Sequence, residues 1–195
     1  NLLDLHKINK SIHTISSVPH AIEFVFFLFG YAFNPVSIPL WCFLFAATST
    51  TTSRSYEIII AYLVSVITTL IATEIGKFSC ATTRPKRQSY RSADNIVRRY
   101  AYLVTSLKSK HSFPSGDVTQ ATNVCFFLLR FLNTSDADKE YEENSYNRKI
   151  ALCAVLLPGV CFARVFYHCH WVEDCFGGIL LATLLYKGGI VPYFV

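Results

Sequence analysis

The sequence predicts an all-α membrane protein: a polytopic helical bundle of five or six spans with an amphipathic helix at its N-terminus. Of the 195 residues, 52% are hydrophobic and only 16% are charged, whereas soluble domains contain about 25% charged residues. The chain also contains long uncharged apolar runs, the clearest at residues 58–73, which are typical of membrane-spanning helices. Together these observations exclude a disordered chain, a coiled coil and a low-complexity array.

The N-terminal segment, residues 1–17, is expected to form a helix that lies in the membrane interface. Its apolar side chains recur at spacings of three and four, with lysine and histidine side chains between them. This pattern gives the helix one apolar face, which suits the boundary between lipid headgroups and hydrocarbon. The apolar positions are Leu2, Leu5, Ile8, Ile12 and Ile15.

The rest of the chain, residues 18–195, is expected to form one membrane-embedded domain. Apolar segments at 21–33 and 36–47 are separated by Asn34-Pro35, and each is shorter than the roughly 20 residues of a full span. We interpret the first segment as a partly inserted helix and the second as a span, with two spans as the alternative. Further spans are predicted at 58–76, 118–132, 150–163 and 175–195.

The charges are divided unevenly between two loops of this domain. Residues 77–116 carry nine of the 18 lysines and arginines and one acidic residue, which gives this segment a net charge of +8 within a total of +5. Residues 133–149 have the opposite bias and are predicted to form an acidic loop at the other membrane face. A basic loop between two spans suits an active site or a lipid-headgroup surface, and its position makes nucleic acid the weakest candidate partner.

Unusual polar residues fall at four segment ends that share one membrane face, because alternate spans run in opposite directions. These residues are Lys77 with Arg84, Ser115-Gly116-Asp117, Arg164, and His170 with Asp174. Ionisable groups at membrane depth are costly and are functional candidates by default. The sequence therefore predicts one site that is assembled from four segments.

The chemistry that this set of residues supports is phosphoryl transfer. Three of the groups are cations, and Ser115-Gly116 stand at the start of a predicted helix, whose N-terminus attracts anions. His170 is a potential nucleophile, and Asp174 four residues later can hold one imidazole nitrogen protonated while the other attacks. Such an arrangement stabilises charge on the oxygens of a transferring phosphoryl group. The seven cysteines form no CxxC pair, and no metal site is expected.

Three short motifs resemble the signatures of the type 2 phosphatidic acid phosphatase superfamily. They are Lys77 with Arg84-Pro85 after six intervening residues, then Pro114-Ser115-Gly116, and then Arg164, His170 and Asp174 followed by Gly178. The order of the motifs and their placement on the predicted spans also resemble the family, over about residues 18–192.

The resemblance implies a membrane-bound lipid phosphatase that needs no metal or other cofactor. It implies that His170 forms a phosphohistidine intermediate and that Asp174 orients the imidazole. The phosphate contacts that it implies come from Lys77, Arg84, Ser115, Gly116 and Arg164. The motif context is nearest to the polyisoprenoid or presqualene diphosphate phosphatase branch. That branch implies a lipid phosphate or diphosphate substrate, surrounding membrane lipids, and an endomembrane location such as the endoplasmic reticulum.

Two positions depart from the family signatures. The second signature ends in a histidine that protonates the leaving group, where this chain has Asp117, and the third begins with a serine, where this chain has Ala163. Loss of the serine costs little, but an aspartate that is ionised at neutral pH cannot donate a proton. Asp117 has three interpretations: a helix N-cap, a working acid, or the mark of a catalytically impaired member kept as a lipid-binding or structural subunit. His111 is an alternative source of the proton.

Overall fold

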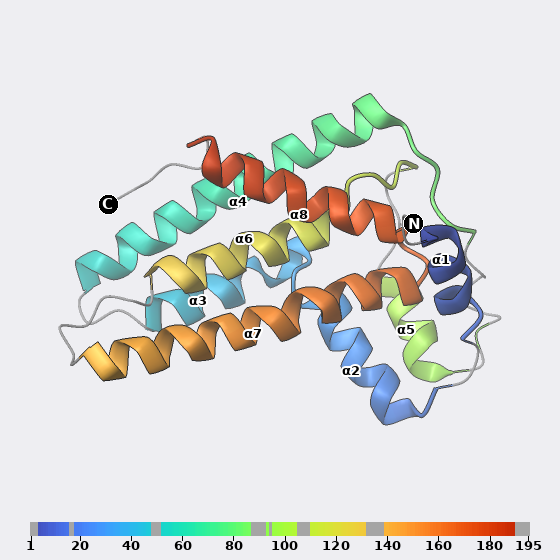
Figure 1. The fold of residues 1–195 in the computed structure, drawn as a ribbon, viewed down its shortest axis with the longest axis horizontal. Coiled ribbons are helices and arrows are strands. Elements are labelled where there is room, and N and C mark those ends of the chain that lie inside the picture. Colours follow the sequence, from blue (N-terminus) through green and yellow to red (C-terminus); the bar gives the residue numbers. More distant parts are fainter. Residues whose placement is uncertain are drawn as a thin grey trace.

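The computed structural model describes residues 4–15, 18–47, 52–86, 93, 95–104, 110–131 and 139–189. Over these residues the fold is all-α, as predicted, with eight α-helices and one short 3₁₀-helix in a single bundle (Figure 1). In chain order the helices are α1 (Leu5–His13), α2 (His20–Tyr31), η1 (Pro35–Ser37), α3 (Ile38–Ala47), α4 (Thr52–Cys80), α5 (Ile96–Val104), α6 (Gly116–Phe131), α7 (Lys139–Phe166) and α8 (Val172–Lys187).

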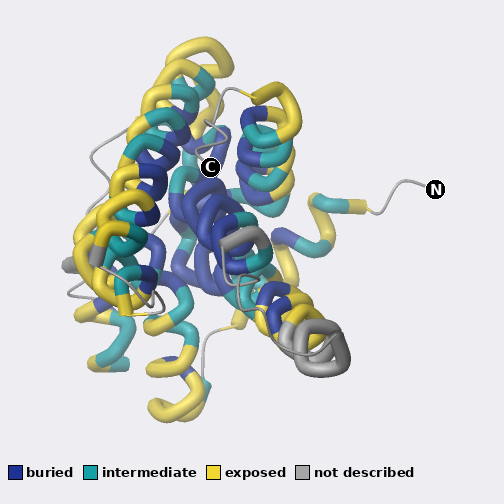
Figure 2. The backbone as a smooth tube through the Cα atoms, turned by 90° about the vertical axis from the view of Figure 1, so that its left-hand side faces the viewer, coloured by how far each residue is buried: buried dark blue, intermediate teal, exposed yellow. Residues whose placement is uncertain are grey.

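Helix α6 is the centre of the bundle and packs against α4, α7 and α8. Residues 117–125 are all buried, and Figure 2 shows the buried residues gathered along the middle of the bundle. Polar side chains on α6 pair with α4: Asn123 Nδ2 donates to Ser65 Oγ at 2.9 Å, and Gln120 Nε2 donates to Thr69 Oγ1 at 2.8 Å. These bonds fix the register of the two helices, as interhelical polar pairs do in membranes.

The outer faces of the bundle are apolar. On α4 the side chains of Ile60, Ile67, Ile71 and Ile75 are each more than half exposed. In water such a stripe would be a strong association surface, whereas bilayer hydrocarbon solvates it. The apolar helices therefore fit a membrane protein.

Judged by the length and composition of its helices, the structure has fewer candidate membrane spans than the sequence predicts. Among the described residues two helical segments are long and apolar enough to cross a membrane, Ser53–Cys80 and Tyr146–Phe166. A third is added if α2 and the segment Pro35–Ala47, which are bent by 81° at the intervening break, count as one broken span. Helices α6 and α8 have 16 residues each, fewer than the roughly 20 of a full span. Five or six spans are therefore not confirmed.

Helix α5 lies inside the segment that the sequence predicts as a basic loop. It is held to α2 by an ion pair, with Arg98 Nε 2.7 Å from Glu23 Oε1, and the Glu23 side chain is fully buried. Asn95 donates to the second carboxylate oxygen of Glu23, and Tyr167 donates to its main-chain carbonyl. Glu23 of α2 thus links α5 with the residue that follows α7. Helix α5 has only nine residues and lies among clustered basic residues, and it was not predicted.

The predicted acidic loop at 133–149 is wrong over most of its length. Helix α7 begins at Lys139 and continues through the charged segment into the apolar one. Lysine, glutamate and arginine are good helix formers, so the helix extends beyond the apolar run instead of stopping with it. Residues 132–138, and the continuation of the last span that was predicted through 190–195, lie outside the described residues.

Candidate active site

The site begins where two segments that flank α5 in the sequence meet. Thr83 and His111 form a single antiparallel bridge. Beside it, the Ser112 N–H donates to the Thr82 carbonyl and the Phe113 N–H donates to Thr82 Oγ1, both at 2.9 Å. These bonds hold the chain after α4 against the chain before α6. As a result the residues at positions 82–84 and 111–113 form one wall of the site.

His170 lies in the connection between α7 and α8 and is 2% exposed. Its Nδ1 is 2.8 Å from the Ser112 carbonyl oxygen. A carbonyl oxygen can only accept a hydrogen bond, so Nδ1 carries the proton and Nε2 carries the lone pair. Nε2 is 3.5 Å from Nη1 of Arg84, which also donates to the Cys169 carbonyl at 2.6 Å. The candidate nucleophilic nitrogen therefore faces a fixed cation.

The pKa of His170 is lowered from 6.5 to about 4, chiefly by burial; the hydrogen bond to Asp174 opposes this change, and the charges of Arg164 and Arg84 add to it. Since a nucleophilic imidazole must be neutral, we expect kcat/KM to hold as the pH falls through 6.5 and to drop near pH 4. A pH profile of phosphate release checks this expectation. The unfolded chain binds the proton more tightly, so His170 should also destabilise the fold as the pH falls from 6.5 toward 4. An acid limb at 6.5 would contradict the burial of the imidazole.

Asp174 occupies the third position of α8 and connects three parts of the site. Its Oδ2 is 3.5 Å from His170 Nδ1 and accepts the Trp171 N–H at 2.8 Å. Its main-chain carbonyl accepts the Ser115 N–H at 2.9 Å. The expected contact between Asp174 and the imidazole is therefore present, but the Ser112 carbonyl is closer to the same ring nitrogen.

The start of α6 is pressed against α8 and α4. A Cβ atom at Gly178 would lie 2.7 Å from the Ser115 carbonyl oxygen, so only glycine allows this approach of α8. Lys77 Nζ lies 3.9 Å from the position that a Cβ would take at Gly116, and it pairs with Glu74 at 2.5 Å. Ser115 Oγ is buried and has no hydrogen-bond partner among the described residues. A hydroxyl and an ammonium group thus stand at this helix N-terminus, where an anion is favoured.

Asp117 forms an ion pair with one of the predicted phosphate ligands. Its Oδ2 is 2.7 Å from Arg164 Nη2, and both side chains are nearly enclosed. Arg164 Nη1 donates to the Gly30 carbonyl at 3.2 Å, and its buried Nε has no partner among the described residues. Helix α6 begins at Gly116, so Asp117 lies within the first turn and is not the N-cap. Of its three interpretations, the N-cap is therefore wrong.

The structure brings the predicted site residues together from four segments, and it adds groups that the sequence did not reveal. The Ser112 carbonyl orients the imidazole. This contact could not be predicted from the sequence, because every residue has a main-chain carbonyl. Glu74 pairs with Lys77. This pairing could have been predicted from the sequence, because Glu74 lies one helical turn before Lys77. His111 takes part in the bridge beside Ser112.

A family model described as the PAP2 superfamily matches residues 58–191. That range covers more than half of the chain and includes every predicted site residue. The chain belongs to the PAP2 superfamily. Comparisons with the curated proteins and with the solved structures found no match.

Members of the PAP2 superfamily are generally phosphatases, so this membership suggests a phosphatase of the PAP2 type. The membership confirms the resemblance that the three motifs carry. It does not confirm the polyisoprenoid diphosphate branch. The apolar outer faces and the family together fit a hydrolase that lies in a membrane.

Proposed function

We propose that this PAP2 protein is a lipid phosphatase that transfers a phosphoryl group first to His170 and then to water. The observation that carries the proposal is the orientation of the imidazole, with Nδ1 bonded to the Ser112 carbonyl and Nε2 facing Arg84. An imidazole held in this way keeps its lone pair directed toward a cation that can bind a phosphate oxygen.

In the first step Nε2 of His170 attacks the terminal phosphorus atom. An N–P bond forms, the P–O bond to the leaving group breaks, and the leaving group departs with that electron pair. In the second step water attacks the phosphorus atom, the N–P bond breaks, and inorganic phosphate leaves while the imidazole returns to its neutral form. The groups that stabilise the phosphoryl oxygens are Lys77, Arg84, Ser115, the Gly116 N–H and Arg164. Neither step uses a metal ion or a cofactor.

The substrate that we propose is a lipid diphosphate, in particular an isoprenoid diphosphate. Asp117 stands where the family signature has its proton donor, and it is paired with Arg164 at 2.7 Å. A monophosphate ester expels an alkoxide, which needs a proton from a general acid. A diphosphate expels a phosphate monoester, whose second pKa is about 6 and which leaves with little protonation. A site without the usual histidine is therefore better suited to diphosphates.

Phosphate release from the detergent-solubilised full chain tests this substrate class. We expect an isoprenoid diphosphate to be hydrolysed about 10²-fold or more faster than phosphatidic acid, because general acid catalysis contributes about 10²–10⁴-fold. EDTA should leave both rates unchanged, and His170→Ala is the control for background release. Faster turnover of phosphatidic acid by the unaltered protein would contradict the proposed preference.

A second candidate function is a catalytically impaired PAP2 member that is kept as a lipid-binding or structural subunit. The ion pair between Asp117 and Arg164 favours it, because this pair occupies a cation that should bind phosphate and leaves no proton donor at that position. The two functions differ in one result. The second predicts no phosphate release from any lipid substrate by the unaltered protein, together with retained lipid binding.

The proposal includes an endomembrane location, such as the endoplasmic reticulum, and membrane lipids as the surroundings of the substrate. Nucleic acid has no part in it. Imaging of the tagged full chain against organelle markers tests the location, and a plasma-membrane signal alone would contradict it.

A further inference from the structure

An apolar pocket of about 380 Å³ lies between α1, α7 and α8. This volume is within the range of about 300–1,000 Å³ that is typical of ligand pockets. The described residues that line it include no charged or amide side chain. Three helices contribute to the walls, through Ile8 and Ile12, Leu157 and Phe162, and Phe176 and Ile179.

The pocket is separate from the phosphate site, although both use the start of α8. Val172, Cys175, Phe176 and Ile179 line the pocket, and at 100° per residue they form one stripe of the helix. Asp174 and Gly178 lie on the opposite stripe, and Gly178 packs on the start of α6. The phosphate site and the pocket therefore lie on opposite sides of the same helical turns.

The pocket opens onto the lipid-facing surface of the bundle. Phe176, which lines it, is 58% exposed, and Leu180 one turn further along α8 is 59% exposed. A membrane hydrocarbon chain can therefore enter from the side without crossing a polar surface.

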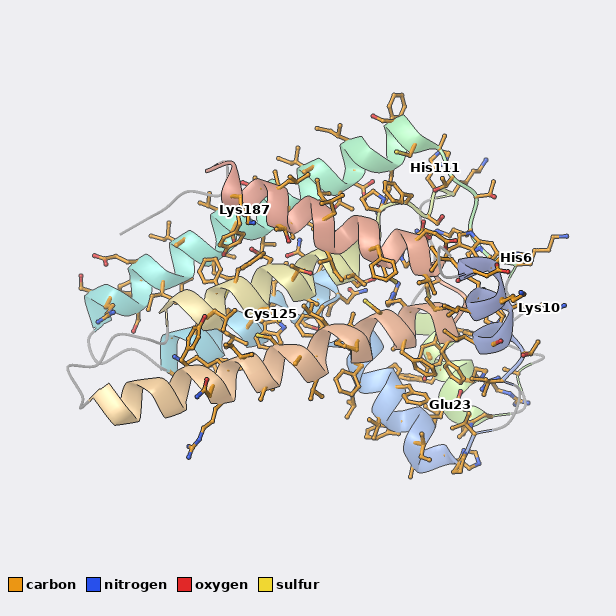
Figure 3. All side chains as sticks on the ribbon, in the orientation of Figure 1. His6, Lys10, Glu23, His111, Cys125 and Lys187 are labelled. Carbon is orange, nitrogen blue, oxygen red and sulfur yellow. The ribbon has the colours of Figure 1, made fainter. Side chains whose placement is uncertain are left out.

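Helix α1 closes the pocket at the end of the bundle that carries the site. It packs against α7 and α8 (Figure 1), and it directs Ile8 and Ile12 into the pocket. Its other face carries the exposed cations Lys7 and Lys10, and Figure 3 shows His6 and Lys10 directed away from the bundle. Lys7 Nζ also lies 3.2 Å from Asp4 Oδ2, but 81% of the Lys7 side chain stays exposed. A helix with this division suits the membrane interface, with its apolar face toward hydrocarbon and its cations among anionic headgroups.

Helix α1 is also joined to the turn that carries Asp174. Asn9 is 3% exposed; its Nδ2 donates to Glu173 Oε2 and its Oδ1 accepts the Val172 N–H, both at 2.9 Å. The residue before α8 is Trp171, whose side chain has no oxygen to accept such a bond. Asn9 thus caps α8 from a different helix, and the position of α1 is linked to the first turn of α8.

We propose that this pocket binds one hydrocarbon chain of an anionic membrane lipid, whose headgroup lies on the basic face of α1. The apolar walls select the chain, the lateral opening admits it, and Lys7 and Lys10 select the negative charge. A chain beneath Ile8 and Ile12 supports α1 in the position in which Asn9 caps α8. The bound lipid is thus distinct from the substrate that is cleaved at His170.

The test uses the full chain in phosphatidylcholine nanodiscs that contain a probe lipid with a photoreactive group in its acyl chain. The probe is either phosphatidylglycerol or phosphatidylcholine, and the labelled peptides are mapped by mass spectrometry. We expect the phosphatidylglycerol probe to label residues 157–165 and 172–179 in the unaltered protein. Ile12→Trp and Ile8→Trp fill the pocket and should each remove this labelling. Ile60→Trp, on the exposed face of α4, is the matched control and should leave it unchanged.

The charge requirement is tested with Lys7→Gln combined with Lys10→Gln. Each cation near an anionic surface contributes roughly a 5-fold gain in binding, so the pair should reduce labelling by about 10-fold or more. Arg148→Gln, at an exposed position near the other end of α7, is the control. Equal labelling by both probes, or labelling that survives both tryptophan variants, would overturn the proposal. Displacement of the probe by an isoprenoid diphosphate would also overturn it, because the pocket would then hold the substrate chain. None of these readouts depends on phosphate release, so the result stands apart from the proposed catalytic function.

Discussion

Replacement of His170 by alanine or asparagine is expected to abolish phosphate release, a fall of about 10⁴-fold or more, because the attacking nitrogen is lost. Asparagine is the matched variant, since its side-chain amide can still donate to the Ser112 carbonyl that now accepts Nδ1–H at 2.8 Å. Alanine leaves that buried carbonyl unpaired, at a cost of about 1–3 kcal/mol in the free energy of unfolding. The measurements are phosphate release and thermal unfolding of both variants in detergent.

The contrast between the two variants separates chemistry from folding. Both should be inactive, while His170→Asn should unfold at nearly the temperature of the unaltered protein. Arg164→Ala should be inactive as well, but it is a poorer test. It leaves Asp117 as an unpaired buried charge, which costs about 3–5 kcal/mol. Activity that survives in His170→Asn would refute the role of the imidazole.

Asp117→His is expected to raise activity on phosphatidic acid by about 10²–10⁴-fold, because it supplies the general acid that alkoxide departure requires. The gain on an isoprenoid diphosphate should be much smaller, since its leaving group needs little protonation. Rates on both substrates with the detergent-solubilised full chain measure the difference.

Asp117→Asn is the control that separates two effects of the aspartate. It removes the charge that pairs with Arg164 at 2.7 Å without adding a proton donor. A gain that both variants share reports the release of Arg164, and a gain that only the histidine variant shows reports acid catalysis. Equal gains on the two substrates with Asp117→His would mean that Asp117 does not set the substrate preference.

The longest helices were predictable because apolar runs in a membrane protein report directly on burial in hydrocarbon. The run that begins at residue 58 lies within α4, and the run at 150–163 lies within α7. Their ends were not predictable, because both helices continue into polar residues beyond the apolar part. The break at Asn34-Pro35 was predictable from the proline, and the structure places the 81° bend there.

The site was predictable as a set of residues but not as a network of contacts. Antiparallel spans bring Arg84, Arg164 and His170 to one face, and this follows from the order of the motifs. The groups that fix these residues are main-chain carbonyls, of Cys169, Gly30 and Ser112 respectively. Every residue has such a carbonyl, so no sequence pattern marks which of them will be used. The sequence also offers several cations that Asp117 could pair with. The packing of α6 against α7 determines that its partner is Arg164.

In the proposed mechanism the phosphoryl group passes through His170. Trapping this intermediate uses an isoprenoid diphosphate labelled in the terminal phosphate, with the reaction stopped by alkali during turnover and the labelled peptide identified by mass spectrometry. We expect a phosphoryl group that is stable to alkali and labile to acid, located on His170, and absent in His170→Asn. Label on another residue, or turnover that continues in His170→Asn, would contradict this account of the protein.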